Sequence, residues 1–132
     1  MLENRKDLSV YRIQTALEKV DSAKLLLDEQ KFKDAANRAY YAMFHAVRAV
    51  LALEGVDFKK HSAVISYFRQ HYIATGLFDK SLSDMIGSAF IVRNQSDYED
   101  FYVISKAQAA EQYENAKQFC SVIAEYLKSQ SD

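Results

Sequence analysis

The feature of this sequence that most restricts its fold is the near absence of residues that form tight turns. The 132 residues include three glycines and no proline, whereas average usage of about 7% glycine and 5% proline predicts roughly 16. β-Sandwiches and barrels need such residues at short intervals to connect their many strands. The scarcity of turn residues favours long helices joined by few loops, and the predicted fold class is therefore all-α.

Length, charge and cysteine content narrow the class of protein further. We expect residues 1–132 to form a single domain, since the length suits one ordinary domain. The formal net charge of −1 means that any contact with nucleic acid must come from a local patch. One cysteine, Cys120, excludes an internal disulfide and is expected to fill the core. The charged N-terminus and the lack of a long apolar stretch predict a cytoplasmic protein without membrane contact.

Apolar residues at helical spacing predict five helical segments, over about 5–28, 31–54, 62–75, 79–96 and 105–128. Gly55 and Gly76 follow two of these segments, and glycine is typical just after a helix. Ser105 is expected to cap the last segment, and residues 95–102 to form an irregular link before it. The expected apolar stripe of the first segment is Val10, Ile13, Leu17, Val20, Ala23, Leu25 and Leu27. These segments predict a single up-and-down helical bundle of four to five helices.

The second segment carries two stripes of side chains at the spacing of one helix face. The apolar stripe consists of Asn37, Tyr40, Phe44, Val47 and Leu51. The neighbouring polar stripe consists of Arg38, Tyr41, His45 and Arg48. One interpretation is a bundle helix whose tyrosines bury their rings and keep their hydroxyls in water. The other is the basic and aromatic rim of a ligand site.

Positive charge is concentrated between Phe58 and Phe78, where no acidic residue occurs. The basic residues of this window are Lys59, Lys60, His61, Arg69 and His71. Such a window is suited to a partner that carries phosphate. Solvated lysines after a turn are the alternative interpretation.

Arg93 and Asp97 stand four residues apart, a spacing that predicts an ion pair within a helix. The planar guanidinium of Arg93 is also suited to binding phosphate or stabilising a phosphoryl transition state. No glycine-rich phosphate loop, HExxH pair or Ser-His-Asp arrangement occurs in the sequence. We therefore expect no metal and no cofactor.

Three segments, in this order, resemble the HEPN domain family and in particular its small stand-alone prokaryotic members. They are Asn37-Arg-Ala-Tyr-Tyr-Ala-Met-Phe-His-Ala46, then Gly55 with Lys59-Lys-His61-Ser62, and Arg93-Asn-Gln-Ser-Asp-Tyr98. The resemblance covers about residues 10–128. It implies a HEPN-like bundle that forms a homodimer with a polar groove across the interface. It also implies either a metal-independent RNase or the partner of a minimal nucleotidyltransferase in a toxin–antitoxin pair.

The RNase motif of this family is only half present. The family pattern is an arginine, usually followed by a polar residue, and a histidine after four to six residues. Arg93 and Asn94 match its beginning, but positions 98–100 are Tyr98, Glu99 and Asp100. A phenol with an ordinary pKa near 10 is a poor base at neutral pH, and Arg93 would lower the pKa of Asp97. Nothing in the sequence places His45 or His61 beside Arg93.

Three functions follow from these observations. The first is a module that binds nucleotide or RNA, or that docks on a nucleotidyltransferase, and it is favoured because the motif histidine is absent. In such a module, arginines would contact phosphate and tyrosines would stack on bases or form hydrogen bonds to them. Its expected ligand-binding residues are Arg38, Tyr41, His45, Lys59, Lys60, His61 and Asn94, together with Arg93, Asp97 and Tyr98. The second is an endoribonuclease toxin with a substituted motif, whose catalytic residues would be Arg93, Asp97 and Tyr98. The third is a purely structural helical dimer. Tyr98 and Tyr102 are candidate positions for nucleotidyl modification by a partner.

Overall fold

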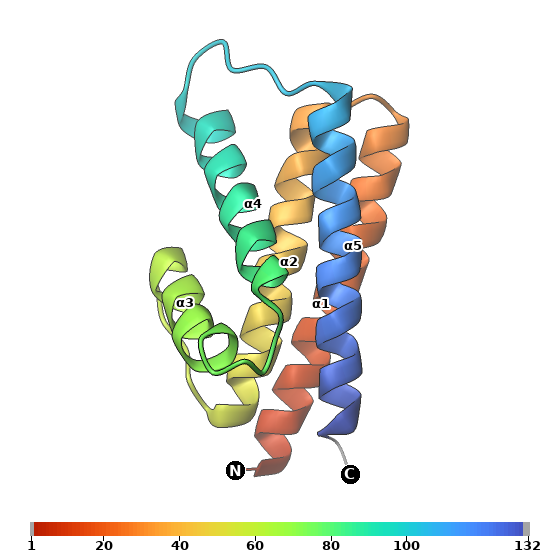
Figure 1. Ribbon diagram of the computed structural model, residues 1–132. Coiled ribbons are helices and arrows are strands. Elements are labelled where there is room, and N and C mark those ends of the chain that lie inside the picture. The colour runs from red at the N-terminus through yellow and green to blue at the C-terminus, as the bar shows by residue number, and fades with distance from the viewer. Residues whose placement is uncertain (1, 131–132) are drawn as a thin grey trace.

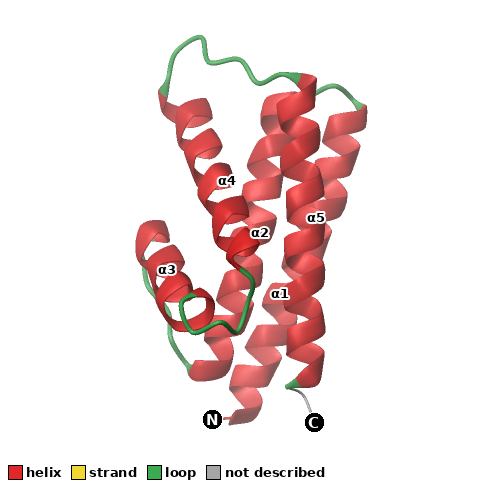
Figure 2. Ribbon diagram, in the orientation of Figure 1, coloured by secondary structure: helices red, strands yellow, loops and turns green. Residues whose placement is uncertain are grey.

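A computed structural model describes residues 2–130, and these residues form helices joined by turns and loops. The elements, in chain order, are α1 (Leu2–Asp28), α2 (Phe32–Glu54), α3 (His61–Phe68), the π-helix η1 (Arg69–Ile73), α4 (Lys80–Tyr98) and α5 (Lys106–Ser129). No strand occurs between residues 2 and 130, as Figure 2 shows. The all-α fold class is therefore confirmed.

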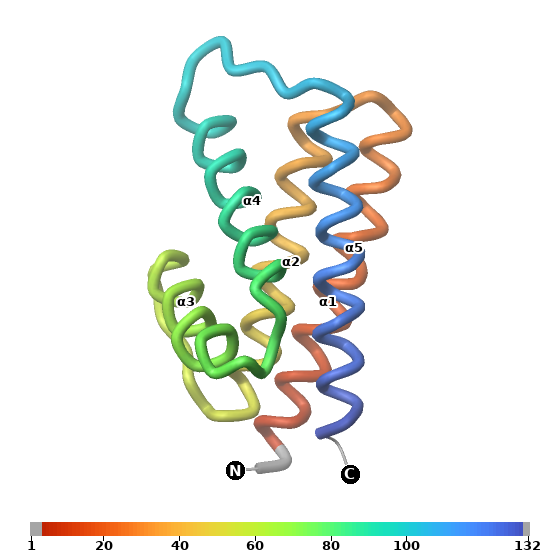
Figure 3. The backbone as a smooth tube through the Cα atoms, viewed as in Figure 1, coloured from red at the N-terminus to blue at the C-terminus, as the bar shows by residue number. Residues whose placement is uncertain are grey.

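The long helices α1, α2 and α5 run side by side, and α4 leans against α2 (Figure 1). The shorter α3 packs against the end of α2, and η1 contacts α4. Helix α2 is central, because it packs against α1, α3, α4 and α5. The backbone trace in Figure 3 shows that α1 begins and α5 ends at the same end of the bundle.

The centre of the bundle is built from the apolar stripe predicted for α2. Tyr40, Phe44, Val47 and Leu51 are all buried. The other faces of α2 carry seven buried alanines: Ala35, Ala36, Ala39, Ala42, Ala46, Ala49 and Ala52. Alanine has the highest helix propensity, and small side chains bring helix axes closer together. Composition and pattern together explain why α2 is surrounded by other helices.

Helix ends follow the predicted capping residues. The Ser105 hydroxyl accepts a hydrogen bond from the Gln108 amide at 3.1 Å, and the Gln108 side chain accepts one from the Ser105 amide at 3.0 Å. This reciprocal pair satisfies two amides at the start of α5. Gly55 ends α2 with φ of 71°, in the left-handed region that glycine adopts without strain. Both predicted caps are confirmed, and Gly55 turns the chain back toward α3.

Helix α1 differs from the sequence prediction in the face that it buries. Val10, Leu17 and Leu25 are 52%, 41% and 68% exposed, so their assignment to the packed face was wrong. The residues that α1 buries are mostly small: Ser9, Ala16, Val20 and Ala23. Ser9 and Ala16 allow close packing against α2, where the Ser9 hydroxyl donates to the Ala49 carbonyl at 2.7 Å. A count of large apolar residues cannot detect such a face.

Helix α4 is longer than predicted and continues through Tyr98. The predicted irregular link over 95–102 is therefore wrong for residues 95–98. Three contacts maintain this last helical turn: the Arg93–Asp97 ion pair at 3.1 Å, the bond from the Ser96 hydroxyl to the Val92 carbonyl, and the bond from the Glu99 amide to the Gln95 carbonyl. The extra turn keeps Asp97 at the helical spacing that pairs it with Arg93.

Helix α3 is attached to the end of α2 by a carboxylate. Glu54 accepts hydrogen bonds from the hydroxyls of Tyr67 and Tyr72. Since Tyr67 lies in α3 and Tyr72 in η1, this contact fixes both elements relative to α2. It thereby determines where His61, the first residue of α3, is placed.

Two further expectations concern the core and the membrane. Cys120 is buried, its thiol lies 3.4 Å from the Ala42 carbonyl oxygen, and burial raises the pKa of this thiol to about 12. Its predicted role in the core is confirmed. Within the described part of the chain, every helix is too short or too polar to cross a membrane.

Candidate functional site

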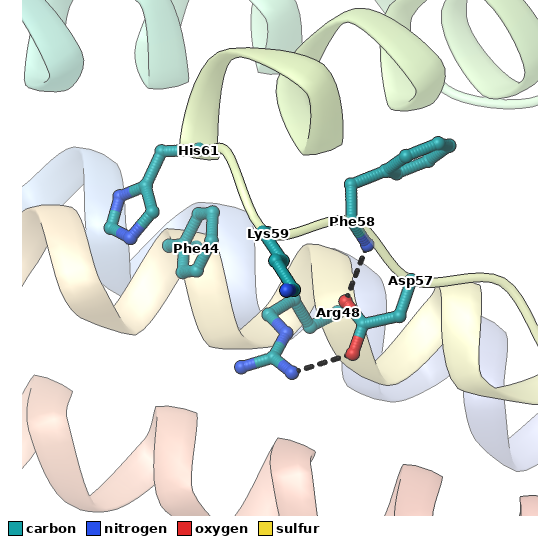
Figure 4. Close-up of a pocket in the computed structure, with 6 residues that line it drawn as sticks. All are labelled: Phe44, Arg48, Asp57, Phe58, Lys59 and His61. Atoms are coloured by element: carbon teal, nitrogen blue, oxygen red, sulfur yellow. Dashed lines mark hydrogen bonds and ion pairs between the residues drawn. The ribbon is translucent and has the colours of Figure 1, made fainter.

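A pocket of about 400 Å³ lies between the second half of α2 and the loop that follows it (Figure 4). Gly55 reverses the chain, so that the loop leads back along α2 before α3 begins. The pocket is lined by Phe44 and Arg48 from α2, Asp57, Phe58 and Lys59 from the loop, and His61 from the start of α3. It therefore combines aromatic rings with three basic side chains and one acid.

His61 is held by two residues of α2. Its ring stacks on Phe44 with centroids 4.0 Å apart, and its Nδ1 lies 2.8 Å from the Tyr40 hydroxyl. Partial burial, and then the positive charges of Arg93 and Arg48, lower the pKa of His61 below its usual value near 6.5. Burial raises the pKa of Tyr40, so the phenol keeps its proton. The pair thus presents a neutral imidazole in a fixed position at neutral pH.

Arg93 extends from α4 to the tyrosines of α2 that lie beside His61. Its Nη2 donates to the Tyr41 hydroxyl at 3.0 Å, and its Nη1 donates to the Asn94 side-chain oxygen at 3.3 Å. Its Nε lies 3.1 Å from the Asp97 carboxylate. The guanidinium carbon is 5.6 Å from the ring centres of both Tyr40 and Tyr41, within the range of cation–π attraction. The predicted Arg93–Asp97 ion pair is confirmed.

Tyr40 and Tyr41 bring His61 and Arg93 into one cluster. The Tyr41 ring centre lies 5.9 Å from the His61 ring centre and 5.6 Å from the Arg93 guanidinium carbon. The structure therefore places an imidazole beside Arg93, which nothing in the sequence indicated. Tyr40 is fully buried and its hydroxyl bonds to His61, so for Tyr40 the interpretation that keeps the hydroxyl in water was wrong. Tyr41 is only partly buried, and its hydroxyl accepts a hydrogen bond from Arg93.

Arg48 occupies the other end of the pocket and shares an acid with α1. Asp57 lies 2.8 Å from Arg48 and 3.1 Å from Arg12. Partial burial alone would raise the pKa of Asp57, but hydrogen bonds from Arg48 and the Phe58 amide outweigh it and lower this pKa. One carboxylate therefore faces two guanidiniums, and Figure 4 shows Arg48 extending toward α1 from the pocket. Lys59 forms no ion pair with the acids of residues 2–130, so the site keeps a positive charge.

The structure brings part of the predicted ligand-binding set together. His61 and Lys59 line the pocket, and Tyr41, Asn94 and Asp97 all contact Arg93 beside it. His45 lies next to this group, with its ring centre 6.3 Å from that of Tyr41.

Three other predicted residues do not line the pocket and have exposed side chains. Tyr98 is 77% exposed, Lys60 precedes α3 with an exposed side chain, and Arg38 is exposed near the start of α2. The basic window around residues 58–78 is also not one patch. Arg69 donates to Ser83 of α4, and His71 stacks on Tyr67 at 4.0 Å. Arg69 and His71 therefore do not line the pocket with Lys59 and His61.

Five residues of the site were not among those predicted: Arg48, Tyr40 and Asp57, and the two rings that line the pocket, Phe44 and Phe58. Arg48 belongs to the polar stripe with Tyr41 and His45, and that stripe was a usable signal. Tyr40 was assigned to the apolar stripe, and its bond to His61 depends on the position of α3. Asp57 follows a glycine turn, and nothing in the sequence indicates that it pairs with Arg12 and Arg48.

The chemistry of this cluster suits an anionic ligand with flat rings. Guanidinium and ammonium groups bind phosphate oxygens, and aromatic and imidazole faces stack on bases. Among residues 2–130, no group of three His, Cys, Asp or Glu side chains is arranged to hold a metal ion. The residues present can therefore bind an anion and, through His61, exchange a proton.

Comparison with known proteins gives the relationships of this chain. It is 31% identical over 128 residues to a UPF0332 protein of Thermotoga maritima, which covers 97% of this chain and 96% of the relative. Two proteins of Methanocaldococcus jannaschii, both named "putative toxin", are also similar. The first is 33% identical over 86 residues, which cover 65% of this chain and 64% of that protein. The second is 29% identical over 119 residues, which cover 90% of this chain and 81% of that protein.

The match to the HEPN domain spans residues 9–127. This range includes the pocket between α2 and α3, the Arg93 cluster of α4 and nearly all of α5. Together with the helical bundle, it confirms the resemblance found in the sequence. The chain belongs to the HEPN domain family.

Proposed function

We propose that the pocket between α2 and α3 binds the phosphate of a nucleotide or of an RNA chain. The observation that carries this proposal is the grouping of Arg48, Lys59 and Arg93 around the stacked rings of Phe44 and His61. Among the residues that the structure describes, Asp57 is the only acid that lines the pocket. Membership of the HEPN family and similarity to proteins named "putative toxin" support a toxin-like or nucleotide-related module.

In the proposed complex, different side chains would meet different parts of the ligand. Arg48 and Lys59 line the pocket and would meet the phosphate, because charge-assisted hydrogen bonds to phosphate are short and strong. Phe58, which is 39% exposed, and the stacked pair of His61 and Phe44 offer ring faces to a base. The ring stacking gives affinity without strict sequence preference.

Binding of fluorescein-labelled octauridylate, measured by fluorescence anisotropy at low salt, tests this proposal. Arg48→Gln and Lys59→Gln should each weaken binding by roughly tenfold, since a hydrogen bond to a charged group contributes about 1.5–3 kcal/mol. Arg69→Gln and Lys117→Gln remove the same charges outside the pocket and should leave affinity within about twofold. Equal losses in all four variants, or no binding by the parent protein, would refute the assignment.

A second candidate function is metal-independent cleavage of RNA, and the position of His61 favours it. When Nδ1–H of His61 donates to the Tyr40 hydroxyl, Nε2 carries a lone pair that can accept a proton. In the reaction, the 2′-oxygen forms a bond to the neighbouring phosphorus and gives its proton to His61. The bond from phosphorus to the 5′-oxygen breaks, and that oxygen takes a proton from water. Arg93 would stabilise the added charge on the phosphate.

Incubation with end-labelled RNA in EDTA tests this second function. Cleavage that yields 2′,3′-cyclic phosphate ends, and that His61→Gln abolishes while His71→Gln does not, would support it. His71 is the matched control because its ring stacks on Tyr67, outside the pocket. No cleavage by the parent protein would exclude this function and leave the binding proposal intact.

A further inference from the structure

We infer that the pocket continues into a second anion subsite on the face between α1 and α2, formed by Lys19 and His45, so that the ligand is a single-stranded RNA rather than a mononucleotide. This inference rests on the proposed function of the pocket, because the subsite would hold a neighbouring phosphate of the same chain. Nothing in the HEPN match or in the names of the relatives assigns Lys19 or His45 a role.

The flank of α1 that borders the pocket is basic. Arg12 and Lys19 are seven positions apart, which places them on the same side of the helix. Thr15 lies between Arg12 and Lys19 on this flank. The side chains of Arg12 and Lys19 are both partly buried. The nearby acids, Glu18 and Asp21, fall about 100° or more from Lys19 around the helix. Asp57 pairs with Arg12 at one end of this flank, whereas none of the residues three or four positions from Lys19 is an acid.

Two hydrogen bonds establish how α1 and α2 are aligned. The Ser9 hydroxyl donates to the Ala49 carbonyl at 2.7 Å, and Arg12 donates to the Arg48 carbonyl at 3.0 Å. The two helices are antiparallel, so two turns further along α1 corresponds to two turns earlier in α2. Lys19 is thus placed opposite the turn of α2 that contains Tyr41 and His45. The register of the pair brings Lys19 next to the polar stripe of α2.

The electrostatic surroundings of His45 agree with this register. Burial lowers the pKa of His45, and the nearby side chains of Arg48, Lys19, Arg12 and His61 lower it further. Lys19 is therefore close enough to His45 to act on it electrostatically, as the helix register requires. An anion placed here would be attracted by the same charges.

The distance along the helix determines which ligand can use both subsites. Arg12 donates a hydrogen bond to the backbone of Arg48, which lines the pocket. Lys19 lies seven residues further along α1, or about 10 Å at 1.5 Å per residue. A single phosphate group is too small to contact both ends of this stripe. Arg12 is already paired with Asp57, whereas Lys19 has no ion pair with the acids of residues 2–130. A strand with successive phosphates would fill the pocket and reach Lys19.

Two probes of different length test the subsite: uridine monophosphate and labelled octauridylate. Lys19→Gln should weaken octauridylate binding by roughly three- to tenfold and reduce the salt slope by about 0.7, the value for one phosphate contact on a single strand. The affinity for uridine monophosphate should remain within about twofold. Lys117→Gln, on the exposed face of α5, controls for the change in net charge.

The possible results separate this inference from the proposed function. Unchanged octauridylate binding in Lys19→Gln would overturn the subsite while Arg48→Gln still identifies the pocket. Equal losses for both probes would also overturn it, because Lys19 would then belong to the first phosphate site. An equal loss in Lys117→Gln would reduce the effect to net charge and overturn it as well. If the parent protein binds neither probe, the pocket proposal itself fails and the subsite with it.

Discussion

Replacing Asp57 by asparagine should make the protein less stable and its pocket a better anion site. Asp57 faces Arg48 at 2.8 Å and Arg12 at 3.1 Å, so the substitution removes one negative charge from between two guanidiniums. The side chain of Arg12 is only 12% exposed, and it would lose its charged partner in a poorly hydrated position. Stability should fall and anion affinity should rise, because the Asp57 carboxylate both stabilises the fold and repels an anionic ligand.

The magnitudes follow from exposure and distance. The carboxylate of Asp57 is 45% exposed, which limits each ion pair to about 0.2–1 kcal/mol. With two pairs and a surviving amide oxygen, the loss of unfolding free energy should be about 1 kcal/mol. For binding, a phosphate charge about 6 Å from the carboxylate in a water-like dielectric is repelled by about 0.7 kcal/mol. Its removal should raise affinity about threefold.

Urea unfolding and anisotropy titration with octauridylate measure the two effects on the same protein samples. Asp84→Asn, an exposed acid of α4 outside the pocket, is the matched control and should change neither quantity appreciably. Weaker binding in Asp57→Asn would refute the reasoning, since Asp57 would then contribute to the ligand site. Stability equal to that of the parent would show that the pairs with Arg12 and Arg48 contribute nothing to the fold.

Three further predictions concern the fold around the site. Tyr40→Phe removes the hydroxyl that bonds to His61, and urea unfolding should show a loss of about 1 kcal/mol; an unchanged midpoint would argue against that bond. Because the pKa values of His45 and His61 are lowered in the folded state, the unfolded chain binds more protons below about pH 6.5, and stability should fall as pH drops from 7.5 to 5.5. The double variant His45→Gln/His61→Gln should show a smaller fall over this range, and an identical fall would contradict the assignment. Ser105→Ala removes the cap of α5 and should lower the thermal midpoint by an amount equivalent to about 1 kcal/mol, whereas an unaltered midpoint would mean that the cap is dispensable.

The parts of the fold that depend on local sequence could be predicted. Few turn residues, helical periodicity and the caps at Gly55 and Ser105 sufficed for the fold class and for most helix positions. The face buried by α1 could not be predicted in the same way. Ser9 and Ala16 pack because they are small, and whether a small residue faces a neighbour depends on how closely the two helices approach.

The candidate site shows the same division between local and distant contacts. The Arg93–Asp97 pair lies within one helix, and its spacing predicts it. The contact of His61 with Tyr40 requires α3 to be positioned at the end of α2, and the contact of Arg93 with Tyr41 requires α4 to lie beside α2 at a particular height. Such relations arise from packing among three helices. The sequence predicts His61 as a ligand-binding residue but does not place it beside Arg93, whereas the fold brings both next to Tyr41.

The central claim is that a phosphate-bearing ligand binds beside His61, and NMR of the histidine side chains tests it most directly. The three histidines, His45, His61 and His71, can be assigned by comparison with His61→Gln and His71→Gln. On titration with uridine monophosphate at pH 7, the account predicts a saturable shift of the His61 ring signals. The signals of His71, which stacks on Tyr67 outside the pocket, should not move. A His61 signal that stays in place at saturating ligand would contradict the account.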